Sequence, residues 1–222
     1  LQHHSMNYNE KAIVNAEIQK LKLENNEAKE VYNKKQVSQS EIDTAYDELK
    51  NTLDSYYDAV SAETAYKSMV LLAKEKVENA VVGNGNGQYP KEAVDALNEA
   101  IRIAEEGFES STSLEEIRNI TKTLKEAIDT FVESVNVIDK AQLEEIISSI
   151  ESKLENAEGV YIPNAIEELK KALDKAKEVL NNEGANEEDI NKAISDLTEA
   201  EANFELSKVP NKDELIIVEK PK

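Results

Sequence analysis

One pattern of mostly apolar residues occurs three times along the chain, with a period near 74 residues. Within each copy these side chains are spaced i, i+3, i+4 and i+7, which places them on one face of an α-helix. A fixed period of this length is typical of an array of repeated units. The copies are Ile42, Ala45, Tyr46, Leu49, Thr52 and Tyr56; Ile117, Ile120, Thr121, Leu124, Ala127 and Phe131; and Ile190, Ala193, Ile194, Leu197, Ala200 and Phe204.

A second helical pattern precedes each copy, and local signals mark where the helices start. Pro90 and Pro163 stand at the first turn of a preceding helix, where a missing N–H costs nothing. Residues suited to N-caps stand just before the last helix of each unit, and Ser113 with Glu116 fits a capping box. These N-caps are Ser38, Ser113 and Asn186. The residues of the preceding helical pattern are Ile18, Leu21 and Ala28 in the first copy; Leu97, Ala100, Ile101 and Ala104 in the second; and Ile166, Leu169, Leu173 and Ala176 in the third.

The pattern predicts an all-α fold of tandem three-helix bundles that share long continuous helices and form an elongated rod. From Glu41 to Val81 there is no Gly or Pro, so we expect one helix of about 60 Å to serve two units. The stretch from Leu114 to Glu158 also lacks Gly and Pro, which predicts a second shared helix, with a kink at residues 136–139 as the alternative.

Five segments follow from these boundaries. Residues 1–6 are typical of a tag remnant, residues 7–60 form an incomplete repeat of two helices, and residues 61–136 and 137–207 form three-helix bundles. Residues 208–222 are a linker or the start of the next module. The incomplete repeat has an apolar stripe that includes Tyr32, Tyr46 and Tyr56, and three outcomes stay open for it: partial exposure, dimerisation, or packing on a neighbouring domain.

Composition excludes several classes of function. The net charge of −20 has no basic patch within it, so we expect no binding to nucleic acid. No apolar run approaches the roughly 20 residues that span a bilayer, so we expect no membrane insertion. The chain lacks cysteine, and its histidines are His3 and His4. We therefore predict no catalytic residues, no metal site and no cofactor, and we interpret the paired carboxylates as solvated surface groups and the glycine-rich residues 83–87 as a flexible connector.

The chain has Tyr-x-Pro at residues 161–163, at the start of the second helix of its unit, and helical patterns at residues 169–180 and 186–197. In these features it resembles the FIVAR modules ("found in various architectures") of Gram-positive extracellular proteins. The resemblance extends over about residues 7–207 and is strongest in the third repeat, residues 137–207. It implies a three-helix bundle in a secreted or wall-attached multimodular protein, beside carbohydrate-active enzymes or adhesin repeats. The family has no catalytic residues to transfer.

The predicted function is a non-catalytic structural spacer or interaction module, whose partners are the neighbouring domains of the same polypeptide. The alternative is a binding module for a glycan or a host extracellular-matrix protein. Tyr89 and Tyr161 are its candidate ligand-binding residues, because they occupy equivalent connections and could stack on a sugar ring. The other interpretation is that each ring caps its bundle core while its hydroxyl reaches water.

Overall fold

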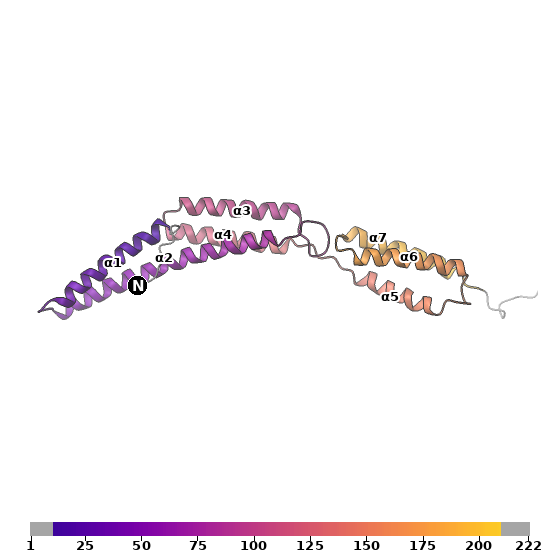
Figure 1. Cartoon of the computed structure of the whole chain (residues 1–222), viewed down its shortest axis with the longest axis horizontal. Helices are drawn as coiled ribbons and strands as arrows, with labels where there is room; N and C mark the ends of the chain where they lie inside the picture. The colour runs from indigo at the N-terminus through magenta and orange to yellow at the C-terminus, as the bar shows by residue number, and fades with distance from the viewer. Residues whose placement is uncertain (1–10, 210–222) are drawn as a thin grey trace, which may run out of the picture. The chain divides into compact units, whose positions relative to one another are not determined.

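The computed structural model describes residues 11–209, and within this range the chain forms seven α-helices and no strand (Figure 1). The prediction of an all-α fold is therefore confirmed. The predicted tag remnant, with His3 and His4, and most of the predicted linker at 208–222 lie outside the described residues. The helices are α1 (Ala12–Asn33), α2 (Gln39–Glu78), α3 (Lys91–Ser110), α4 (Leu114–Glu133), α5 (Ala141–Glu155), α6 (Pro163–Asn181) and α7 (Glu187–Glu205).

The described helices group into two compact units. Helices α1 to α4 belong to the first unit, and α5 to α7 belong to the second unit together with the loop at residues 81–90. The predicted boundaries at residues 60, 136 and 207 remain predictions. No described helix is long and apolar enough to cross a membrane.

The first unit is organised around α2, a single helix of 40 residues. Its first half forms an antiparallel hairpin with α1, and its second half packs with α3 and α4 as a three-helix bundle (Figure 1). At 1.5 Å per residue α2 is about 60 Å long, so the predicted shared helix is confirmed. The core of this bundle consists of Tyr66, Val70 and Ala73 of α2, Leu97, Ile101, Ala104 and Phe108 of α3, and Ile117, Leu124, Ile128 and Phe131 of α4.

The predicted N-caps are confirmed, with one correction in detail. Ser38 accepts a hydrogen bond from the backbone N–H of Glu41, and the Glu41 carboxylate accepts one from the Ser38 N–H, which is a complete capping box. Asn186 forms the same arrangement before α7. Ser113 caps Glu116, but the Glu116 carboxylate accepts from the N–H of Thr112 instead of Ser113, so only half of the predicted box forms.

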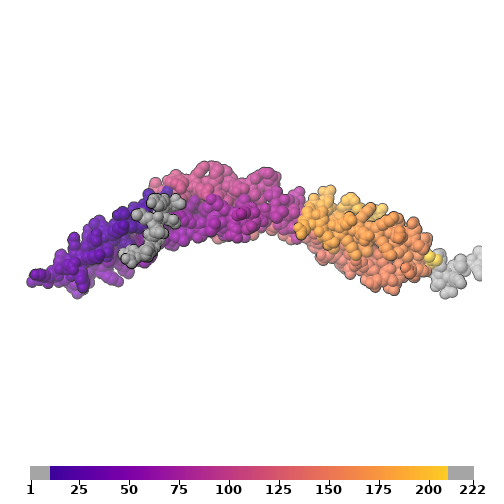
Figure 2. Space-filling model, viewed as in Figure 1, coloured from indigo at the N-terminus to yellow at the C-terminus, as the bar shows by residue number. Residues whose placement is uncertain are grey.

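The second unit contains the third repeat of the sequence pattern, formed by α5, α6 and α7. It is a three-helix bundle with one continuous apolar core. Side chains fill the space between its ribbons, as Figure 2 shows for the orange and yellow part of the chain. The largest fully buried side chains come from all three helices, so each helix depends on the other two for its burial. They are Leu143 and Ile150 of α5, Leu169 of α6, and Ile190 and Leu197 of α7.

The second predicted shared helix is wrong, because α4 ends at Glu133 and α5 begins only at Ala141. The break coincides with the predicted kink at residues 136–139. There the Asn136 N–H donates to the carbonyl of Gln88 at 2.8 Å, and the Asn136 carbonyl accepts from the Gly87 N–H at 2.8 Å. A backbone paired with another loop cannot also form i→i−4 helical bonds. The local sequence adds little helix propensity, since Val135, Val137 and Ile138 are β-branched.

Candidate functional site

Tyr161 lies in the connection between α5 and α6 and packs its ring on the bundle core. The ring stacks on buried Phe204 with a centroid separation of 4.0 Å and an interplanar angle of 24°. The Tyr161 hydroxyl donates to Glu205 Oε2 at 3.0 Å. Burial, followed by this hydrogen bond, raises the pKa of the Tyr161 hydroxyl. One face of the ring is therefore occupied by Phe204, and the hydroxyl is held by a carboxylate.

A lysine of α5 completes the polar group around Tyr161. Lys153 Nζ lies 2.6 Å from Glu201 Oε1 and 2.5 Å from Glu205 Oε1. Hydrogen bonds from Lys153 and then from Tyr161 lower the pKa of Glu205 against the opposing effect of desolvation, and the bonds to both glutamates raise the pKa of Lys153. The group ties α5 to α7 at the edge of the core, which is a structural role.

Tyr89 lies in the equivalent connection between α2 and α3, and it is half-buried. Its backbone N–H donates to Val81 at 2.9 Å, and its carbonyl accepts from Gly83 at 3.0 Å. The residue before each tyrosine also has an equivalent bond, because the Gln88 carbonyl accepts from Asn136 and the Val160 carbonyl accepts from Val209, both at 2.8 Å. The two connections are thus built alike, each pairing with the chain that leaves the last helix of its repeat.

The second unit does not bring Tyr89 and Tyr161 together. Tyr161 precedes the first residue of α6, whereas the loop at 81–90 contacts the opposite end of that helix: a Cβ added at Gly85 would meet the carbonyl oxygen of Glu183, just after α6. The 19 residues of α6 span about 28 Å. One sugar ring therefore cannot contact both tyrosines.

A shallow groove of about 1090 Å³ follows α6 and α7 on the side away from α5. Its lining combines buried core residues such as Leu169 and Leu197 with exposed or half-buried side chains such as Ala172, Lys175 and Asp196. A catalytic site requires a concave pocket where buried polar groups converge. None of the polar or charged side chains that line the groove is buried, so the groove resembles the solvated outer side of a helix pair.

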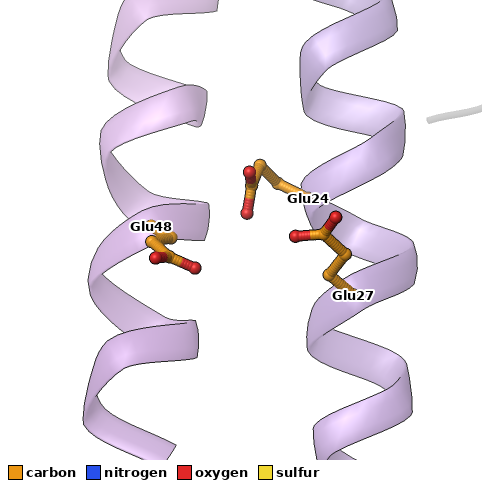
Figure 3. Close-up of side chains that lie close together, drawn as sticks. All are labelled: Glu24, Glu27 and Glu48. Atoms are coloured by element: carbon orange, nitrogen blue, oxygen red, sulfur yellow. The ribbon is translucent and has the colours of Figure 1, made fainter. Parts of the chain in front are cut away.

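Three carboxylates converge between α1 and α2: Glu24 and Glu27 point toward Glu48 across the hairpin (Figure 3). Their nearest oxygens lie within 4.8 Å of one another, which is a spacing that a hard cation such as Ca²⁺ could bridge. Burial, and then the charges of Glu27 and Glu48, raise the pKa of Glu24. The cluster is largely exposed to solvent. The equivalent positions of the third repeat have Ala172, Lys175 and Asp196, so the three glutamates are not a feature that the repeats share.

Glu63 is the one acidic side chain among the buried residues in the described part of the chain, at 4% exposure. Its Oε1 lies 2.8 Å from Lys67 Nζ and accepts from the backbone N–H of Lys11 at 3.3 Å. Lys11 in turn donates to the carbonyl of Glu109 at 2.7 Å and lies 5.2 Å from the centre of the Phe108 ring. These contacts fix the start of α1 to α2 and α3, and the sequence pattern gave no signal for them.

Comparisons with known proteins agree with this architecture. The model of the FIVAR domain matches residues 73–132 and 139–205, which together make up more than half of the chain. The chain is also similar to a gellan lyase of a Bacillus species, with 30% identity over 166 residues. That alignment covers 66% of this chain and 6% of the lyase, so the chain spans a small fraction of the relative's length. No solved structure matches the chain.

Proposed function

This chain belongs to the FIVAR domain family, and we propose that it is a non-catalytic spacer that holds the domains of a secreted or cell-surface bacterial protein apart. The observation on which this depends is α2, which passes without interruption from the α1 hairpin into the bundle with α3 and α4. A helix shared by two packed bodies can curve gently, but it cannot kink sharply between them without disrupting backbone hydrogen bonds. The α1 hairpin and the bundle with α3 and α4 are therefore held apart along one stiff helix.

Two further features support this proposal. The carboxylate cluster at Glu24 and the ion pairs of Lys153 lie at the surface, exposed or half-buried, and not in an enclosed pocket of the kind that tunes a catalytic carboxyl or lysine. The similarity to a small part of a gellan lyase supports a place in a multimodular carbohydrate-active enzyme. A wall-attached adhesin of a Gram-positive bacterium is the other host protein that fits a module of this family.

The glycan- or matrix-binding alternative has less support. Stacking on a sugar requires a free ring face on the surface, and Phe204 already occupies one of the two faces of the Tyr161 ring. The two candidate tyrosines also lie at opposite ends of α6, so they form no shared aromatic platform.

The spacer function is tested by measuring how stiff α2 is. The chain has no cysteine, so spin labels placed by Ser40→Cys and Lys76→Cys report on α2 alone. Both positions are exposed and lie 36 residues apart on one helix, which predicts a Cα separation of about 54 Å and a narrow distance distribution in pulsed dipolar spectroscopy.

Ser61→Pro in the labelled protein is the control, since proline in a helix interior removes one hydrogen bond and kinks the helix at a cost of about 3 kcal/mol. The Ser61→Pro distribution should broaden and shift to shorter distances. A distribution in the unmodified sequence that is as broad as that of the proline variant would show a flexible joint at this place, and the spacer proposal would be rejected.

A further inference from the structure

The α1–α2 hairpin exposes a face whose counterpart is buried in the complete third repeat. Residues of α6 and α7 correspond to residues of α1 and α2 at an offset of 148 positions. Ile42 is 43% exposed whereas its counterpart Ile190 is 1% exposed, and Val37 is 37% exposed whereas Ala185 is fully buried. The hairpin therefore has the core residues of a repeat without the burial.

The helix that accounts for this difference is α5, which contacts both α6 and α7 in the third repeat. Lys153 of α5 bonds to Glu201 and Glu205, so these two positions of α7 face α5. At the matching positions of α2 the hairpin has Leu53 and Tyr57, which are apolar and aromatic. We name the surface formed by these and the neighbouring counterpart residues the open face; it consists of Tyr32, Ile42, Tyr46, Leu53 and Tyr57.

Charge adds a second criterion for what covers this face. In the third repeat Lys177 of α6 pairs with Glu151 of α5. In the second repeat the matching pair has the opposite polarity, with Glu105 of α3 bound to Lys74 of α2. The covering helix thus presents the charge opposite to that of the hairpin in both repeats. The hairpin of the first repeat has Lys29 at this position, beside the open face.

We propose that the open face is the docking surface for one amphipathic α-helix of the α5 type. Such a helix places apolar side chains at the spacing of Leu143, Ile147, Ile150 and Leu154 against the open face, and it presents a carboxylate to Lys29 where α5 presents Glu151. It completes the third three-helix bundle of the chain.

One position limits the affinity of this docking. Asn25 stands where α6 has Leu173, a core residue that is 5% exposed. Covering Asn25 removes an amide from water, which is costly unless the amide finds a hydrogen bond. A helix added as a free peptide would therefore bind weakly, and a tethered helix is the better probe because tethering raises its effective concentration.

The probe is a copy of residues 139–158, containing α5, fused ahead of residue 1 of the full chain through a flexible Gly/Ser linker. Hydrogen exchange of the α1 and α2 amides is compared with that of a control fusion in which the copied Leu143, Ile147 and Ile150 are changed to Ser. Docking is expected to slow exchange in α1 and in residues 39–57 at least about tenfold relative to the control, which corresponds to about 1.4 kcal/mol.

Charge reversal tests the register. Changing the copied Glu151 to Lys should speed exchange about twofold at low salt, as expected for an exposed ion pair, and Lys29→Glu in the same protein should restore the slower rate. Equal exchange in the probe and control fusions would overturn the proposal. A dimer of the unextended chain in sedimentation, with the open face protected, would overturn it in favour of a second copy. The spacer function is measured on α2 without any probe, so the two proposals can fail separately.

Discussion

Leu173 tests whether the buried stripe of the repeat holds the second unit together. Its side chain is 5% exposed and belongs to the continuous core formed by α5, α6 and α7. Leu173→Ala removes three buried carbon atoms from the hydrophobic core and leaves a cavity that the three helices cannot fully close. Such substitutions cost about 2–5 kcal/mol, which includes both the lost burial and the cavity.

Hydrogen exchange followed by peptide mass analysis is the suitable assay, because it reports on each unit separately. A cost of about 2.8 kcal/mol would raise the open population of the second unit about a hundredfold. Amides of α5, α6 and α7 should therefore exchange about that much faster in Leu173→Ala, while amides of α3 and α4 should keep their rates, since they belong to the first unit.

Glu187→Ala is the matched control on the same unit. Glu187 is exposed in the first turn of α7, where its negative charge interacts with the helix dipole and stabilises the helix by at most about 1 kcal/mol. Equal acceleration of exchange by Glu187→Ala and Leu173→Ala would refute the helical register on which the core assignment depends.

Four more substitutions have defined outcomes. Ser38→Ala removes the N-cap of α2 and should cost about 1 kcal/mol, seen as faster exchange at the start of α2. The pKa of Glu205 is lowered in the folded chain, so its ion pair with Lys153 stabilises the fold at pH values above the ordinary glutamate pKa of about 4.3. This stabilisation is lost as the pH falls through the lowered pKa of Glu205 in the folded state. Lys153→Met should therefore reduce the loss of melting temperature between pH 7 and pH 3, and an unchanged pH dependence would contradict the pairing. Tyr161→Phe keeps the stack on Phe204 and should cost less than about 1 kcal/mol, whereas Tyr161→Ala should cost about 2 kcal/mol in urea unfolding.

The elements that the sequence predicted well are those determined by neighbouring residues. The length of α2 follows from a stretch without Gly or Pro, and its start follows from Ser38 and the acid three residues later. These signals act within one helical turn, so no tertiary contact is needed to read them. The position of Tyr161 between two helices was predictable for the same reason, from the proline two residues later.

The contacts that the sequence did not specify join residues far apart in the chain. The break between α4 and α5 is stabilised by bonds from Asn136 to residues near Gly87, about 50 positions earlier. The cluster of Glu24, Glu27 and Glu48 exists only because α1 and α2 pair in one register across the hairpin turn. Stacking of Tyr161 on Phe204 likewise requires the closed bundle. Periodicity gives the faces of helices, but it does not give the register between them.

The opposite polarity of the interhelical pairs suggests how the repeats avoid exchanging helices. Pairing α5 with α3 would place Glu151 against Glu105, and pairing α2 with α6 would place Lys74 against Lys177. The apolar stripes alone cannot prevent such exchange, because the repeats share one spacing of core residues. Exposed ion pairs add little stability, at most about 1 kcal/mol, but a like-charge pair in each wrong arrangement adds a penalty that the correct arrangement lacks. The two pairs therefore act on the choice of partner more than on stability. In an array of helices that share one spacing of core residues, this selectivity favours bundles assembled from a single repeat.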